Sequence, residues 1–323
     1  MVIASFLMPM LDLALAPEHL LRGFVAASFL SGWIITVLDM PIYMAWEGRR
    51  FWPRRLWNRG VRREEGRLDR VYAVIEGWRA PPKGMRPPEL LEKPESNSPL
   101  HSEYIRRERA AAEASIEWRT FPIPETSSDV DWTAMQMRGS REAQLPTRLG
   151  NLLLSIEQYP WLIYGMDGIF YWNRLWLKMD DSARGQIDDV QAMADSTLYV
   201  ATALLMGALL CVAYAASAPF SLALDWPVAV TWYWWLAIAG VSVLLAVAFY
   251  RGGLFLHKTY GELYKALFDT WAADIDLGAA RAALAERRGL DRDAIDKMPL
   301  TNRNSGLWRF LHNYRIKPKL EDW

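Results

Sequence analysis

Hydrophobic residues gather in blocks along this chain, and the blocks predict membrane-spanning helices. The longest block runs from residue 196 to residue 250 and holds a single formal charge, Asp225. Dividing it at the proline-containing turn of residues 217–227 leaves apolar stretches at 197–218 and 228–250. A helix rises about 1.5 Å per residue, so each stretch can cross a hydrocarbon core of about 30 Å. A buried soluble hairpin would show a polar stripe along each helix, and neither stretch has one.

A third apolar block covers residues 24–46 and predicts another span, with an acidic residue inside it. Asp39 lies towards its C-terminal end, and the apolar residues before it are too few to cross a bilayer alone. We therefore place Asp39 within the membrane, where a carboxylate usually faces a partner or water. A structural hydrogen bond to another helix is the preferred interpretation. A proton or ion site, or a carboxylate at the level of the lipid headgroups, are the alternatives.

Residues 2–16 are also apolar, but the stretch is short and contains Pro9 and Asp12. It resembles a signal peptide, yet no basic residue precedes Arg22, so cleavage is not expected. We expect this stretch to lie at the membrane interface or to insert partly, with a fourth span as the alternative. The predicted fold class is an all-α membrane protein with three transmembrane helices and a helical cytosolic region.

Basic residues predict the orientation of these spans. Seven arginines and no acidic residue occur between Arg49 and Arg63, directly after the first span. Because such residues stay in the cytoplasm, residues 47–195 and 251–323 are expected there and the 217–227 loop outside. The arginines are interleaved with aromatic residues, which also suits nucleic acid. Beside a span, however, anionic lipid headgroups are the expected partner, and a net charge of zero argues further against nucleic acid.

The remaining residues are predicted to form helices on the cytosolic side. Apolar residues at helical spacing predict an amphipathic helix at 62–79, followed by a proline-rich linker at 81–99 and a charged, alanine-rich helix at 102–118. The chain is thus expected to have five parts: an N-terminal membrane segment at 1–46, cytosolic helices at 47–144, an aromatic segment at 145–195, a transmembrane hairpin at 196–252 and a cytosolic helical tail at 253–323.

Aromatic residues crowd the segment from 159 to 177, which holds seven of them. Trp and Tyr favour the bilayer interface, because their rings are apolar at one end and polar at the other. We expect this segment to lie on the cytosolic face of the membrane. An aromatic ligand pocket is the alternative.

Short motifs in the second half of the chain follow one another in a fixed order. They read LPTRLGN at 145–151, YGMD at 164–167, RLW at 174–176, and YGEL with FD at 260–269. In this order they resemble an uncharacterised family of bacterial integral membrane proteins. The resemblance implies a bacterial inner-membrane location and a multi-pass topology. It implies no chemistry, because no activity is known for that family.

The charged residues within these motifs are the candidate structural or interaction residues. Half-buried charges need partners, so we expect the 145–178 segment to dock against the helix at 255–271 through arginine–carboxylate pairs. Arg148 or Arg174 is expected to meet Glu262 or Asp269. The full set of candidates is Asp39, Arg148, Asp167, Arg174, Glu262 and Asp269.

The sequence offers little material for catalysis. One cysteine excludes a disulfide framework and a cysteine-based metal centre, and four scattered histidines favour no other metal site. His257 stands five residues before Glu262, which is not the spacing of a zinc-protease helix. No phosphate loop, dinucleotide fingerprint or serine-hydrolase turn is present. We expect no catalytic residue, metal or cofactor.

The predicted function is therefore that of a non-enzymatic membrane protein that acts as an interaction or assembly component. Its expected partners are the lipid bilayer and either another protein or further copies of the chain. The first alternative is an oligomeric channel or membrane-disrupting effector gated by its cytosolic part. The second is a membrane-bound enzyme acting on a lipid-linked substrate.

Topology reporters test the predicted orientation. A reporter fused at Pro94 should be active on the cytosolic side, and the same reporter fused at Ala223 should be active on the outer side. Signals from the same side for both fusions would contradict a hairpin at 196–252.

Overall fold

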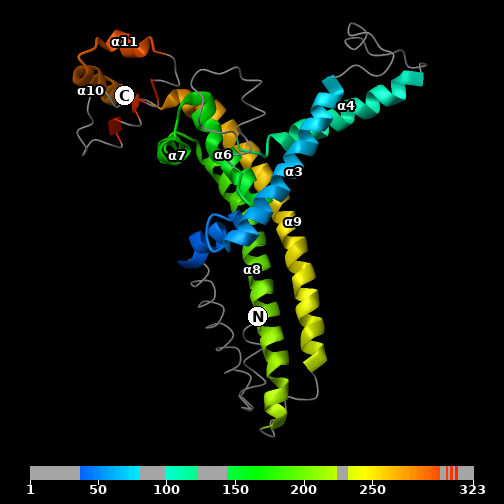
Figure 1. Cartoon of the computed structure of the whole chain (residues 1–323). Helices are drawn as coiled ribbons and strands as arrows, with labels where there is room; N and C mark the ends of the chain where they lie inside the picture. The colour runs from blue at the N-terminus through cyan, green and yellow to red at the C-terminus, as the bar shows by residue number, and fades with distance from the viewer. Residues whose placement is uncertain are drawn as a thin grey trace. The chain divides into compact units, whose positions relative to one another are not determined.

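The computed structural model describes residues 37–79, 99–122, 144–223, 232–275 and 277–298, and a few residues between 303 and 311. Every regular element in this part of the chain is helical, which confirms the all-α prediction (Figure 1). Residues 37–47 are helical. The elements after these residues are α3 (Arg54–Arg79), α4 (Pro99–Trp118), α6 (Arg148–Tyr164), α7 (Gly168–Trp176), α8 (Asp181–Ala223), α9 (Trp232–Trp271), a 3₁₀ turn (Ala272–Asp274), α10 (Gly278–Arg288) and α11 (Arg292–Asp296).

Two helices of the described residues are long and apolar enough to cross a membrane. They are Asp181–Ala216, within α8, and Tyr233–Asp274, which covers α9 from its second residue and the 3₁₀ turn after it. The predicted spans at 197–218 and 228–250 overlap these helices, and residues 228–231 lie outside the described residues. The span predicted at 24–46 is described only from residue 37, and the stretch at 2–16 lies outside the described residues.

Both long helices begin or end well beyond their apolar stretches. α8 begins at Asp181 and α9 ends at Trp271, so each has a polar section that continues the same helix. With 43 and 40 residues, each helix is about 60 Å long at 1.5 Å per residue. The polar section of α8 was not expected as part of the same helix, because nothing in its own sequence marks continuity with the apolar stretch.

The aromatic segment at 159–177 is broken into two helices. α6 ends at Gly165, which adopts a left-handed conformation with φ of 63°. A glycine tolerates this conformation, which closes a helix. α7 then begins after Asp167, whose carboxylate accepts a hydrogen bond from the Phe170 amide at 2.7 Å. The YGMD motif at 164–167 therefore forms the turn between α6 and α7.

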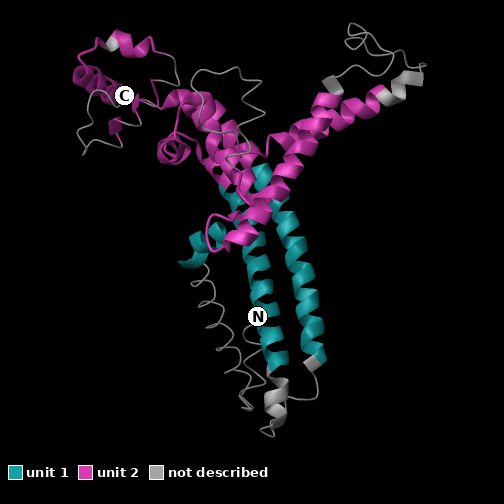
Figure 2. Ribbon diagram, viewed as in Figure 1, with its two compact units in different colours: residues 1–46, 188–260 teal, residues 47–187, 261–323 magenta. Residues whose placement is uncertain are grey.

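The chain folds into two compact units (Figure 2). Unit 1 comprises residues 1–46 and 188–260, and unit 2 comprises residues 47–187 and 261–323. In unit 1, the α8 residues Ala208 and Cys211 pack with Ala239 of α9, and these small side chains allow close helix packing. Trp46 donates a hydrogen bond to Thr202 (2.8 Å) and its ring stacks on Tyr250.

Unit 2 is held together by a joint in which backbone meets backbone. A Cβ atom on Gly150 would lie 2.2 Å from the Glu47 carbonyl oxygen, and one on Gly60 would lie 2.6 Å from the Pro146 carbonyl oxygen. Both distances are far below van der Waals contact, so only glycine fits at either position. The segments around residues 47, 60 and 146–150 therefore approach one another closely, and the Pro146 ring packs against Gly48 and Gly60.

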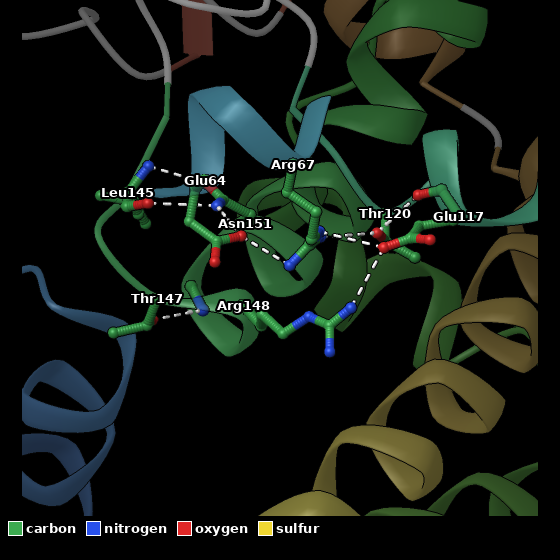
Figure 3. Close-up of polar contacts among 9 residues, drawn as sticks. Glu64, Arg67, Glu117, Thr120, Leu145, Thr147, Arg148 and Asn151 are labelled. Carbon is green, nitrogen blue, oxygen red and sulfur yellow. Dashed lines mark hydrogen bonds and ion pairs between the residues drawn. The ribbon is translucent and has the colours of Figure 1, made fainter. Parts of the chain in front are cut away.

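The LPTRLGN motif supplies the polar half of this joint. The Thr147 hydroxyl accepts a hydrogen bond from the Gly150 amide at 3.0 Å and so caps the start of α6. Asn151 is fully buried, and its amide group closes a ring with Leu145 (Figure 3). It accepts from the Leu145 amide at 2.7 Å and donates to the Leu145 carbonyl at 3.1 Å. The motif is thus a structural element that fixes the entry of the chain into α6.

Adding one methyl group at Gly150 tests whether the backbone contact at this joint stabilises unit 2. Gly150→Ala should destabilise unit 2 by about 1–3 kcal/mol, because the new Cβ meets backbone that no rotamer change can move. Thermal unfolding in detergent measures this change. Gly185→Ala is the matched control, since its Cβ meets nothing within 4 Å and alanine favours a helix by about 1 kcal/mol over glycine. Equal stability of the two variants would contradict the joint.

Candidate functional site

The principal candidate site is a charged groove between α3 and α4. The two helices lie side by side and share a small apolar core that includes Leu68, Val71 and Ala114. Beside this core opens a groove of about 510 Å³. Its charged lining consists of Arg63, Arg67, Arg70 and Arg148 together with Glu64, Glu113 and Glu117. The groove carries one more positive than negative side chain, so it suits an acidic or mixed-charge partner surface.

Arg67 lines the groove and is buried, whereas the other three arginines of the groove are exposed. Its side chain is 11% exposed and forms ion pairs with Glu64 at 2.6 Å and with Glu117 at 3.1 Å (Figure 3). It also donates to the Thr120 hydroxyl at 3.4 Å, and its guanidinium lies 4.3 Å above the centre of the Phe121 ring. Partners on several sides offset the cost of removing this charge from water.

Glu64 connects the groove to the joint of unit 2. The Asn151 side chain donates to Glu64 at 3.4 Å, while the same side chain holds Leu145 in place. Burial raises the pKa of Glu64, and the neighbouring Arg67 acts in the opposite direction. The same buried amide therefore contacts both the groove and the LPTRLGN motif.

The predicted arginine–carboxylate pairs of the motif residues are wrong. Arg148 pairs with Glu117 on α4, at 3.1 Å. Arg174 donates to the Phe170 carbonyl at 2.8 Å and lies over the Phe170 ring. Glu262 pairs with Lys265, one turn away on α9, at 3.3 Å.

The segments expected to dock do contact each other, but through tyrosine hydroxyls. Asp269 accepts hydrogen bonds from Tyr159 at 2.7 Å and from Tyr164 at 2.5 Å. Burial and the bond to Asp269 raise the pKa of Tyr164 to about 12. Trp172 stacks on Tyr264, with ring centres 4.9 Å apart. A phenol satisfies a carboxylate without bringing a second charge, so the aromatic residues perform the role assigned to arginine.

Asp39 lies in unit 1, and it accepts a hydrogen bond from the Tyr199 hydroxyl at 2.6 Å. This contact is of the structural kind that the sequence analysis preferred. Beside it lie Tyr43, Asp195 and the buried His257, and the Tyr43 hydroxyl is hydrogen-bonded to each of the other two. Sequence reasoning missed this group. The one available signal was the i, i+4 spacing of Asp39 and Tyr43, which places both on one helix face.

Arg49, the first of the seven arginines, is engaged within unit 2. It forms ion pairs with Glu47 at 2.5 Å and with Glu157 of α6 at 2.8 Å. Burial raises the pKa of Glu47 to about 7, and the Arg49 charge opposes that rise. This arginine therefore links the end of the first predicted span to α6. The contact with lipid headgroups that the sequence predicts is therefore expected of the other six arginines between Arg49 and Arg63.

Arg67 should matter far more to stability than Arg148. Arg67→Met leaves Glu64 buried without its counter-ion and should cost about 3–5 kcal/mol, the range for breaking a buried pair. Arg148→Met removes a half-exposed pair and should cost about 0–1 kcal/mol. Denaturant unfolding in detergent measures both. The double variant Arg67→Met/Glu64→Gln should recover part of the lost stability. If Arg67→Met costs no more than Arg148→Met, the buried Arg67–Glu64 ion pair is contradicted.

Comparisons with protein-family models, with curated proteins and with solved structures find no match to this chain.

Proposed function

We propose that this chain is a multi-pass protein of the bacterial inner membrane that acts, without catalysis, as an interaction or assembly component. In this proposal α8 and α9 form the hairpin that crosses the bilayer. Unit 2 then presents the charged α3–α4 groove to a partner protein in the cytosol. The resemblance of the ordered motifs to bacterial membrane proteins is consistent with this assignment.

The observation that supports the membrane assignment most strongly is the bare apolar surface of α9. Only 11% of its most apolar stretch is buried within the chain, although the mean hydropathy of the candidate span reaches 1.8. Large side chains such as Val241, Leu244 and Val247 are exposed along it. Exposing such a surface to water is unfavourable, so lipid or another apolar helix must cover it.

The length of the helices supports a role outside the bilayer. Each helix is about 60 Å long, whereas the hydrocarbon core is about 30 Å thick. The apolar stretch accounts for one part of each helix, and the remainder carries charged residues such as Asp188 and Lys258. An interaction component needs such a polar extension, because it displays protein surface beyond the lipid headgroups.

An oligomeric channel is the second candidate. The same exposed surface of α9 could pack against further copies of the chain, and residues 203–207 of α8 have small residues four positions apart. A pore built this way needs several copies, because one hairpin cannot enclose water. The mass of the protein in detergent and ion flux through liposomes separate this function from the first.

Site-specific photo-crosslinking tests the proposed function. A photoreactive residue at Val74, exposed within the groove, should give a discrete adduct with one other protein in intact cells. The same residue at Ile116, which is similarly exposed on α4 but does not line the groove, is the control. Arg70→Glu should remove the Val74 adduct, because it reverses charge in the groove.

Two outcomes would contradict the proposal. Equal adducts from Val74 and Ile116 would show that the groove has no special role. A Val74 adduct made only of further copies of the chain, together with ion flux in liposomes, would favour the channel.

A further inference from the structure

Three side chains in unit 1 form a hydrogen-bonded chain that neither the groove nor the proposed function uses. Tyr43, from the helix at 37–47, donates a hydrogen bond to Asp195 of α8. The same hydroxyl lies 3.0 Å from Nε2 of His257 on α9. Nδ1 of His257 lies 2.8 Å from the Gly253 carbonyl oxygen. The chain therefore connects three helical segments of unit 1 through one phenol.

The positions of the protons in this chain follow from which atoms can donate. A carbonyl oxygen only accepts, so Nδ1 of His257 must be protonated to bond Gly253. The Tyr43 hydroxyl has one proton, yet it lies between two acceptors: the Asp195 carboxylate and, in a neutral imidazole, Nε2. With only that one proton, one of the two contacts is left without a hydrogen bond. One additional proton satisfies both.

That additional proton can occupy either of two positions. In the first arrangement it lies on Nε2, which donates to the Tyr43 oxygen while Tyr43 donates to an ionised Asp195. In the second, Asp195 is a carboxylic acid that donates to the Tyr43 oxygen, while Tyr43 donates to a neutral Nε2. Two short shifts interconvert them: the phenol proton moves to Asp195 and the Nε2 proton moves to the phenol oxygen. The total charge is unchanged.

From this geometry we infer that Asp195, Tyr43 and His257 form a binding site for one shared proton and a relay for it between a carboxylate and an imidazole. The ligand of the site is a proton from water. Tyr43 is the bridging group, because neither Asp195 nor His257 is hydrogen-bonded to the other directly.

The surroundings of the relay are polar and closely packed. His257 is 2% exposed, so the shared proton is held away from bulk water. Asp195 also accepts a hydrogen bond from Gln191. Among the residues that the structure describes, the titratable groups facing the relay are Asp39 on the helix at 37–47 and Tyr199 on α8, and these two are hydrogen-bonded to each other.

The close approach of α8 and α9 beside His257 ties proton binding to helix packing. A Cβ atom on Gly253 would lie 2.6 Å from the Thr197 hydroxyl oxygen, so the glycine lets the two helices meet. The Gly253 carbonyl is also the acceptor for Nδ1 of His257. Loss of the shared proton removes one of the hydrogen bonds that join the three segments, so the relay couples pH to the packing of unit 1.

The test follows the imidazole and the carboxylate separately in the full-length protein in lipid nanodiscs. Nitrogen chemical shifts of ¹⁵N-labelled histidine, assigned by the signals lost in His257→Gln, report the protonation of Nδ1 and Nε2. Infrared difference spectra, assigned with Asp195→Asn, report the acid carbonyl band of Asp195. We expect one common midpoint for both signals, because coupled groups titrate as a pair.

Tyr43→Phe should separate the two signals, with midpoints at least about one pH unit apart, because the bridging hydroxyl is gone. Tyr199→Phe is the control, since it removes the bond to Asp39 and leaves the relay intact, so the common midpoint should persist. Identical titrations in the protein and in Tyr43→Phe would overturn the inference. So would an Nδ1 that carries no proton.

A second measurement does not depend on Tyr43→Phe folding. Asp195→Asn keeps a polar side chain of the same shape but cannot take the proton. The nitrogen shifts of the labelled histidine should show that His257 titrates at a shifted midpoint in this variant, because its proton is no longer shared with a carboxylate. An unshifted His257 midpoint would overturn the relay.

Discussion

The apolar surface of α9 is the constraint on which the rest of the structure depends. Burial of such surface is the main favourable term in folding, yet this helix leaves most of its apolar stretch uncovered by its own chain. The small residues Ala208 and Cys211 of α8 and Ala239 of α9 pack together where the two helices meet. In the proposed hairpin, lipid covers the remaining apolar faces of the two helices, and their polar sections lie beyond the lipid.

Within each unit, several buried or partly buried polar groups are hydrogen-bonded or ion-paired to neighbouring polar groups. In unit 2, the Arg67 guanidinium is surrounded by two carboxylates, a hydroxyl and an aromatic ring, and Asn151 serves both Glu64 and Leu145. In unit 1, Tyr43 serves both Asp195 and His257. A side chain with two partners fixes more geometry than one with a single partner, because moving it breaks both contacts. Asn151 fixes the LPTRLGN motif in this way, because it bonds both Glu64 and Leu145. Tyr43 likewise holds the relay, because its one hydroxyl contacts both Asp195 and His257.

The local pattern of the chain predicted its helices well and its long-range contacts poorly. The apolar runs at 197–218 and 228–250 mark α8 and α9, because hydrophobicity is a property of the run itself. The partner of Arg148 is Glu117, on a different helix, and no periodicity connects the two positions. The roles of Gly60 and Gly150 were likewise invisible, since they depend on backbone that approaches from elsewhere in the chain. Asp269 was identified as a contact residue, but its partners are phenols, which a search for opposite charges does not find.

The central claim is that the exposed apolar surface of α9 faces lipid, and cysteine accessibility tests it most directly. Leu244 in α9 and Leu177 at the end of α7 are almost equally exposed in the structure, at 72% and 77%. Each is replaced by cysteine in a chain whose only native cysteine, Cys211, is changed to alanine. In open membrane vesicles, a membrane-impermeant maleimide should label Leu177→Cys readily and leave Leu244→Cys unlabelled until detergent is added. Equal labelling of both cysteines before detergent would show that α9 faces water and would contradict the account.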